Sequence, residues 1–190
     1  MASFDAAIKV VLMHEGGYVN NPNDSAGATN YGVSLKFLAD HPDEGDFNGD
    51  GHVDIHDIMN MTREEAIAIY KEFWWDKYGY AKILDETVAT KVFDFSINMG
   101  SVRAHKLLQQ ALNTAFGLKL TVDGILGPAS FNILAAVANN DEQKLITSYC
   151  DCAWGFYQSL VANNPKFGVF KNGWRSRAYS ISIANSIVEG

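Results

Sequence analysis

Helix start and stop signals constrain the fold of this chain more than any other feature of its sequence. Residues 85–99 carry an apolar stripe with helical spacing that ends at Gly100, and residues 102–116 carry a second stripe that ends at Gly117. Glycine ends a helix readily because it adopts the left-handed backbone conformation that other residues avoid. The two segments therefore predict two consecutive helices.

The same signals predict helices along most of the remaining chain. Caps, apolar stripes and breakers place them over residues 3–15, 34–40, 62–73, 128–138, 140–163 and 172–188. Between Gly16 and Ser34, turn residues are mixed with residues that favour strands, which predicts one small hairpin. Strands and helices do not alternate elsewhere, so we predict a mainly α domain of seven to eight helices with one small β-hairpin.

Length, charge and hydropathy narrow the class of protein. A chain of 190 residues suffices for a single domain, 1–190, and a weak change in composition near residues 117–123 marks a C-terminal subdomain of about 118–190. The net charge of −7 disfavours a nucleic-acid partner, because phosphate binding needs a basic surface. No apolar run approaches the ~20 residues of a membrane span, and no basic region precedes the first apolar stretch. We therefore expect neither a transmembrane segment nor a signal peptide.

The acidic segment DFNGDGHVDIHD, residues 46–57, matches the spacing of a calcium-binding loop of the EF-hand and dockerin type. The predicted ligands are oxygens of Asp46, Asn48, Asp50, His52, Asp54 and Asp57. Alternate residues of a curled loop can bring about six to eight oxygens to one point, as a hard cation requires. His52 would contribute its carbonyl oxygen rather than its imidazole. We predict a structural Ca²⁺, and the alternative is a metal-free turn rich in Asx hydrogen bonds.

A glutamate stands where the first predicted helix ends, in the stretch HEGGYVNNPNDSAGATNYGVS of residues 14–34. An acidic residue at a helix C-terminus opposes the helix dipole, so a purely structural role would favour Lys or Arg there. A partly buried carboxylic acid beside an apolar helix can instead donate a proton to a leaving oxygen. Asp24 and Thr29 follow on the predicted hairpin, and an inverting glycosidase needs a second carboxylate across the cleft. Spacing alone leaves Glu15 as a helix-ending charge, part of a metal loop or a catalytic acid.

Several sequence blocks resemble glycoside hydrolase family 108, the N-acetylmuramidases of phages and prophages. The blocks are HEGGYVNNPNDSAGATNYGVS, MTREEAIAIYKEFWWDKYGY, VFDFSINMGSVRAHKLLQQAL, VDGILGPAS and FKNGWRSRAYS. The resemblance implies a lysozyme-like α+β fold with the hairpin next to the catalytic helix. It also implies hydrolysis of the β-1,4 bond between N-acetylmuramic acid and N-acetylglucosamine in peptidoglycan. The last third of the chain resembles the peptidoglycan-binding segment of such proteins.

The resemblance implies roles for individual residues as well. Glu15 is the catalytic glutamate, and Glu15, Asp24 and Thr29 follow the order of the triad in phage-type lysozymes. Eight residues separate Glu15 from Asp24 as in that triad, whereas the four residues between Asp24 and Thr29 are one fewer. Further candidates for sugar binding are Tyr18, Asn30, Tyr31 and Asn98. The calcium loop lies outside the family pattern and is interpreted as an insertion.

A phage endolysin stays in the host cytoplasm until a holin gives it access to the cell wall. The resemblance therefore implies peptidoglycan as the substrate and a holin as a partner, and we expect a monomer with lytic, antimicrobial action. Two other functions fit the same residues. A lytic transglycosylase needs only the acid/base glutamate, because a hydroxyl of the sugar attacks in place of water. A non-catalytic wall-binding module would depend on the calcium loop alone.

Overall fold

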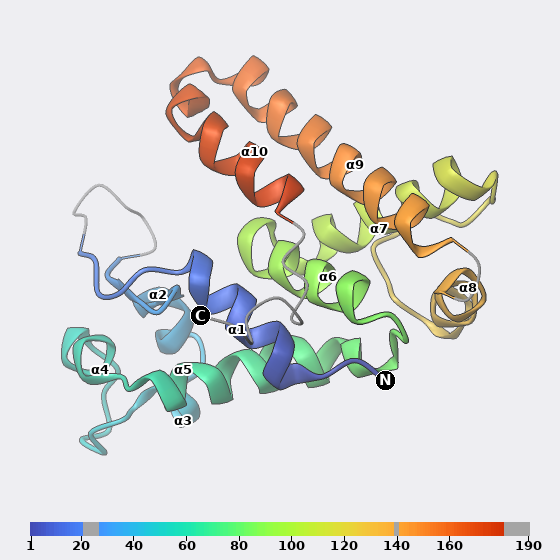
Figure 1. Cartoon of the computed structure of the whole chain (residues 1–190). Coiled ribbons are helices and arrows are strands. Elements are labelled where there is room, and N and C mark those ends of the chain that lie inside the picture. Colours follow the sequence, from blue (N-terminus) through green and yellow to red (C-terminus); the bar gives the residue numbers. More distant parts are fainter. Residues whose placement is uncertain (21–26, 139–140, 181–190) are drawn as a thin grey trace, which may run out of the picture. The chain divides into compact units, whose positions relative to one another are not determined.

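The computed structural model describes residues 1–20, 27–138 and 141–180, and the chain divides into two compact units. The first unit comprises residues 8–73, and the second comprises residues 1–7 together with the chain from residue 74 onward. The described residues form ten α-helices and one two-stranded antiparallel sheet (Figure 1). This confirms the mainly α, lysozyme-like class with one hairpin. The helix number exceeds the prediction because two short helices, α3 (Pro42–Gly45) and α4 (Ile55–Asn60), adjoin the acidic loop.

The unit of residues 8–73 combines the small sheet with short helices. Its other elements are α1 (Phe4–His14), whose first turn belongs to the second unit, β1 (Thr29–Asn30), β2 (Val33–Ser34), α2 (Leu35–Ala39) and α5 (Arg63–Tyr70). In the sheet, Thr29 lies opposite Ser34 and Asn30 lies opposite Val33. The core of this unit draws buried apolar side chains from α1, β2, α4 and α5, among them Val11, Val33, Ile58 and Ala66.

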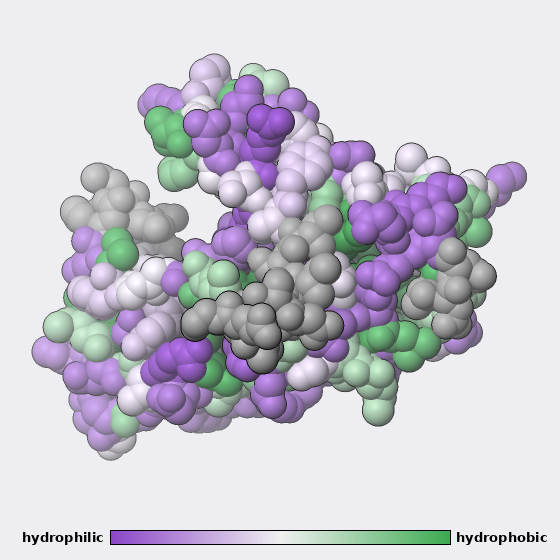
Figure 2. Space-filling model, viewed as in Figure 1, coloured by the Kyte–Doolittle hydropathy of each residue, from purple (hydrophilic) through white to green (hydrophobic). Residues whose placement is uncertain are grey.

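The second unit is an assembly of longer helices. Its longest members are α6 (Glu86–Met99), α7 (Ser101–Phe116) and α9 (Glu142–Asn163), and its shorter ones are η1 (Lys71–Asp76, which begins in the first unit), η2 (Tyr80–Lys82), α8 (Pro128–Ala138), η3 (Pro165–Phe170) and α10 (Lys171–Tyr179). Helix α7 contacts both α6 and α9, and α9 lies beside α10 (Figure 1). The face of the α9–α10 pair visible in Figure 2 is mostly hydrophilic, as expected for the solvent side of amphipathic helices. Across the described ranges, no helix combines the length and apolar character that a membrane span requires.

Side-chain caps set the starts of several helices where the sequence predicts them. These caps are Ser34 on α2, Thr62 on α5, Asp85 on α6 and Asp141 on α9. At α5 the cap is reciprocal, because the Glu65 carboxylate also accepts the Thr62 N–H at 2.7 Å. The π-helical turn of η1, with the sequence KEFWWD, is not predicted by the apolar pattern. The end of the predicted helix 172–188 lies outside the described residues, which reach Tyr179 in helical form.

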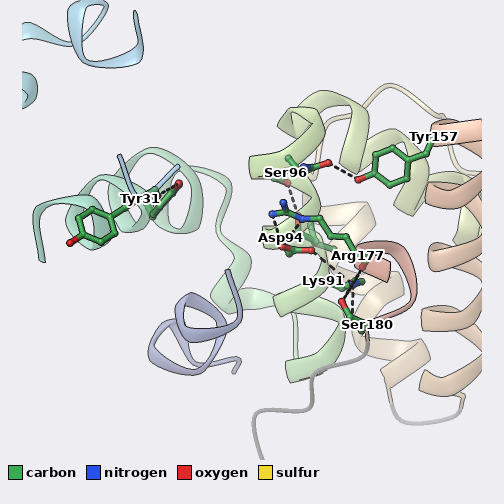
Figure 3. A network of polar contacts seen from close by, with 10 residues as sticks. Tyr31, Lys91, Asp94, Ser96, Tyr157, Arg177 and Ser180 are labelled. Atoms are coloured by element: carbon green, nitrogen blue, oxygen red, sulfur yellow. Dashed lines mark hydrogen bonds and ion pairs between the residues drawn. The ribbon is translucent and has the colours of Figure 1, made fainter. Parts of the chain in front are cut away.

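A buried charged cluster joins α10 to α6 within the second unit (Figure 3). The Arg177 guanidinium donates to Asp94 Oδ1 from Nε at 3.1 Å and from Nη2 at 2.8 Å. Lys91 Nζ donates to the Ser180 carbonyl at 2.8 Å and lies 3.9 Å from Asp94 Oδ2. Asp94 is fully buried, and desolvation lowers the pKa of Lys91. Ion pairs around a buried carboxylate therefore join α10 to α6.

Candidate active site

Glu15 follows directly after the last residue of α1. Its backbone N–H still donates to the Val11 carbonyl at 3.2 Å, so the α1 hydrogen-bond pattern extends to this residue. Gly16 and Gly17 come next and leave the chain free to turn away from the helix axis. The Glu15 side chain is half-buried. The end of α1 therefore holds a carboxyl group that is partly shielded and yet reachable from solvent.

A strained two-residue turn connects β1 to β2 opposite this glutamate. Both turn residues have positive φ, 48° at Tyr31 and 81° at Gly32, which is the backbone pattern of a tight hairpin. Among the described residues, Tyr31 is the only non-glycine residue with positive φ. The Tyr70 hydroxyl, from the end of α5, donates to the Tyr31 carbonyl at 2.9 Å. This hydrogen bond helps to hold Tyr31 in a conformation that bulky residues seldom adopt.

Gly32 brings the turn into direct contact with the glutamate. A Cβ atom at Gly32 would lie 2.6 Å from Glu15 Oε2 and 2.5 Å from the Tyr70 hydroxyl oxygen. Both distances are below van der Waals contact, so only a residue without a side chain allows this approach. The Glu15 carboxyl group and the Tyr70 hydroxyl consequently lie against the same turn. The hairpin forms one wall of the Glu15 environment, in agreement with the arrangement expected from sequence.

Replacing Gly32 by alanine tests whether this close approach positions Glu15. A left-handed alanine costs about 1–2 kcal/mol, and the added methyl group displaces the glutamate. We expect hydrolysis of peptidoglycan to fall about 10²-fold, since a 1 Å displacement of a reacting group has an effect of that order. Gly117→Ala is the matched control, because Gly117 also has positive φ, 66°, and a Cβ there would meet nothing within 4 Å. Equal activity losses in the two variants would contradict the positioning role.

The other residues predicted for this site differ in how exposed they are and in the partners that they bind. Asp24 lies outside the described residues. The backbone of Thr29 exchanges two hydrogen bonds with Val19, each 2.8 Å long, and its side chain is half-buried. Tyr18 is 41% exposed, which leaves its ring available to a ligand. Asn30 is buried, and its Nδ2 donates to the Ile58 carbonyl at 3.0 Å, so its amide group fastens β1 to α4.

Asn98 belongs to α6 in the second unit. Its Oδ1 accepts a hydrogen bond from the Tyr157 hydroxyl at 2.6 Å. The Tyr157 ring in turn stacks on Trp174, with ring centroids 5.0 Å apart and an angle of 17° between the planes. The amide oxygen of Asn98 is thus engaged by its own unit, and its role in sugar binding stays a prediction.

Sequence reasoning missed the contribution of Tyr70. Helical spacing assigns this residue to the apolar face of α5, and its ring is indeed buried. Its hydroxyl nevertheless reaches the turn of a hairpin almost forty residues earlier. A buried tyrosine usually finds a partner for its hydroxyl, but the sequence gives no signal for which backbone carbonyl that is.

The acidic loop is closed by hydrogen bonds from its own backbone. The carboxylates of Asp46 and Asp57 accept these bonds, and the donors are the N–H groups of Phe47, Asn48, Gly49, Asp50, Gly51 and Asp54. The oxygen-rich set of side chains suits a hard cation such as Ca²⁺. Within the described parts of the chain, however, no three His, Cys, Asp or Glu side chains are grouped to hold a metal ion. The described loop is thus a network of Asx hydrogen bonds, and calcium stays a prediction.

Comparisons with known proteins give two family matches and a similar fold. Residues 8–100 match the family model described as glycosyl hydrolase 108, and residues 103–179 match the one described as predicted peptidoglycan domain. The solved structure of Brucella abortus SagA is 28% identical in sequence with a TM-score of 0.72, and the match covers 98% of this chain and 96% of that chain. No curated protein matches the sequence significantly. Glu15 and the hairpin fall in the first matched segment, and most of α7 together with α8, α9 and α10 falls in the second.

Proposed function

From the match of residues 8–100 to the glycosyl hydrolase 108 family model, we propose that this chain belongs to that family and that the protein is a muramidase. Its reaction is hydrolysis of the β-1,4 bond between N-acetylmuramic acid and N-acetylglucosamine. The peptidoglycan-domain match of residues 103–179 supports a glycosidase that degrades peptidoglycan. The observation that carries the proposal is the half-buried Glu15 carboxyl group beside the strained turn at Gly32.

Each step of the proposed reaction uses a residue of the first unit. Glu15 protonates the glycosidic oxygen, which lets the sugar leave as a neutral alcohol. Asp24 directs a water molecule to the opposite face of the sugar ring or stabilises the positive charge that develops there, and Thr29 assists it. Tyr18 and the turn at Tyr31 contact the sugars. Asp24→Asn tests the second carboxylate: unchanged activity would reduce Asp24 to a turn-forming residue.

Analysis of the products of peptidoglycan digestion tests the proposed reaction. A hydrolase leaves N-acetylmuramic acid with a free reducing end, which mass spectrometry detects. A lytic transglycosylase, the second candidate on the same fold, leaves a 1,6-anhydro end instead, so the mass of the terminal sugar is lower by one water. A wall-binding module without catalysis would produce neither. Anhydro ends as the main product would overturn the muramidase proposal and keep Glu15 as the acid/base group.

We also propose that the loop of residues 46–57 binds a structural Ca²⁺. Binding would draw the loop oxygens of residues such as Asp46, Asp50 and Asp57 toward one ion and stabilise the insertion between α3 and α5. The ion would take no part in bond cleavage, because Glu15 and Asp24 supply the chemistry. The proposal rests on the spacing of the oxygen-bearing residues in the sequence.

Calcium titration tests this proposal by its effect on stability. At free Ca²⁺ about 100-fold above Kd, binding to the folded state adds about 2.7 kcal/mol to the free energy of unfolding. We therefore expect a chelator to lower the Tm, while activity persists wherever the protein stays folded. Asp46→Asn should abolish the rise in Tm that Ca²⁺ causes. Asp40→Asn, at an exposed position outside the loop, should preserve that rise. A calorimetric titration without heat of binding would refute the site.

A further inference from the structure

The loop of residues 120–127 is fastened to α7 by two buried side chains. Gln109 donates from Nε2 to the Ile125 carbonyl at 3.1 Å, and its Oε1 accepts the Gly124 N–H at 2.8 Å. His105 Nδ1 donates to the Gly124 carbonyl at 3.0 Å. Burial lowers the pKa of His105, and its Nε2 is hydrogen-bonded to the Tyr80 hydroxyl, 2.8 Å away. These hydrogen bonds hold the loop of residues 120–127 against α7.

Gly124 allows the loop of residues 120–127 to approach α7 closely. Its φ is 84°, and a Cβ there would lie 2.8 Å from the Val102 carbonyl oxygen and 3.3 Å from Lys106 Cγ. The loop backbone consequently packs directly on the first turns of α7. Beside this contact, the side chains of Val102 and Ile125 remain 59% and 67% exposed. Two apolar side chains are thus exposed to solvent next to the contact between this loop and α7.

Two adjoining cavities open at this position, each about 470 Å³ in volume. Both are lined by Tyr78 and Val102, so the two cavities adjoin, and together they are called the groove below. The first cavity also includes Arg103, Lys106 and Phe156, and the second includes Lys77, Lys82 and Phe131. All of these residues belong to the second unit.

The groove is basic although the chain as a whole carries a net charge of −7. Its lining holds four cationic side chains, those of Lys77, Lys82, Arg103 and Lys106, and one carboxylate, that of Asp76. Asp123, whose Oδ1 accepts a hydrogen bond from Gln109 at 2.8 Å, adds a second carboxylate beside Lys106, so the cationic side chains still outnumber the carboxylates by two. Three of the cations lie over aromatic rings. Arg103 lies 4.8 Å from the centre of Phe156, Lys82 lies 5.6 Å from that of Phe131, and Lys77 lies 5.9 Å from that of Tyr78. Such contacts hold flexible cationic side chains in place before a ligand arrives.

We propose that this groove binds the carboxylate-bearing peptide stems of peptidoglycan. The inference rests on the proposed function for the identity of the polymer and adds a second recognition site to it. Cationic side chains are suited to carboxylates through charge-assisted hydrogen bonds, whereas the hydroxyl and N-acetyl groups of the sugars offer them no opposite charge. The exposed Val102 and Ile125 supply apolar contact for the alanine side chains of a stem. The second unit therefore selects glycan that still carries its peptides.

A peptide without any glycosidic bond tests the groove separately from catalysis. We expect the native protein to bind the stem tripeptide L-Ala-γ-D-Glu-diaminopimelate in calorimetry, and to bind its fully amidated form at least about tenfold more weakly. The double variant Arg103→Gln/Lys106→Gln should also lose about tenfold in affinity for the free acid. Lys119→Gln/Lys144→Gln is the matched control, because it removes the same charge from exposed positions outside the groove and Lys144 also lies over a ring, that of Phe116.

The outcomes separate this inference from the muramidase proposal. Three outcomes would refute peptide binding by the groove: equal affinity for the acid and the amide, equal losses of affinity in both double variants, or no binding of the peptide. Hydrolysis of glycan strands whose peptides are removed and whose lactyl carboxylates are then amidated reports on the muramidase alone, and it should be unchanged by Arg103→Gln/Lys106→Gln. Strand hydrolysis without peptide binding would leave the muramidase intact and refute the groove. Peptide binding without any hydrolysis would support the groove and refute the muramidase proposal.

Discussion

Glu15→Gln is expected to eliminate most of the peptidoglycan hydrolysis while the fold persists. Glutamine has nearly the same shape as glutamic acid but has no proton to donate to the glycosidic oxygen. General acid catalysis contributes about 10²–10⁴-fold to a rate, so we expect a loss of that size in the release of reducing ends. The half-buried side chain next to Gly32 tolerates an isosteric change, so the Tm should move little.

A surface carboxylate provides the control for this variant. Glu44 lies on α3 in the same unit and is exposed, so Glu44→Gln makes the same chemical change away from the turn. Its activity should equal that of the native protein. If Glu15→Gln is folded and retains more than about a tenth of native activity, Glu15 is not the acid and the proposed chemistry fails.

The second large effect is expected on stability, from Arg177→Gln. The guanidinium of Arg177 donates two hydrogen bonds to Asp94, which is fully buried. Asp94 Oδ2 has no hydrogen-bond partner within the described chain, so removal of Arg177 leaves a buried carboxylate with only the Lys91 ammonium nearby. Breaking one partner of a buried pair costs about 3–5 kcal/mol, which we expect to see as a lower free energy of unfolding in urea.

Two further variants identify the cause of that loss. Arg175 lies on the same helix and is exposed, so Arg175→Gln should change the free energy of unfolding by less than about 0.5 kcal/mol. Adding Asp94→Asn to Arg177→Gln removes the buried unpaired charge, and we expect part of the stability to return. A small effect of Arg177→Gln alone, similar to that of Arg175→Gln, would show that the pair contributes little to holding α10.

Local signals predicted the helices because they act within a few residues. Gly100 and Gly117 end α6 and α7, and both have the positive φ that the stop signal requires. The caps at Ser34 and Thr62 also form as expected, since each needs only a hydroxyl and an N–H three residues later. The short helices beside the acidic loop were missed because they span only four and six residues, too few for an apolar period to stand out.

The candidate site was predictable in part. The sequence places Glu15 where a helix ends and predicts a hairpin between Gly16 and Ser34. It treats Tyr31 as a strand residue, however, whereas the structure places Tyr31 in the turn between β1 and β2. The sequence did not predict that His105 and Gln109 fasten the loop of residues 120–127 to α7, although the two residues stand four apart on one face of that helix. Their partners are backbone groups of residues 124 and 125, and the sequence pattern carries no information on which backbone groups a buried side chain meets.

The sequence by itself determined the helical class, the helix limits and the position of the glutamate, because these follow from periodicity and local backbone preference. Only the tertiary structure decided that Glu15 and Tyr70 both lie against Gly32, and that Arg177 pairs with Asp94. These contacts join residues far apart in the chain, and they depend on packing, burial and the need of each buried polar group for a partner. Such requirements are satisfied only once the chain has folded, so no local pattern encodes them.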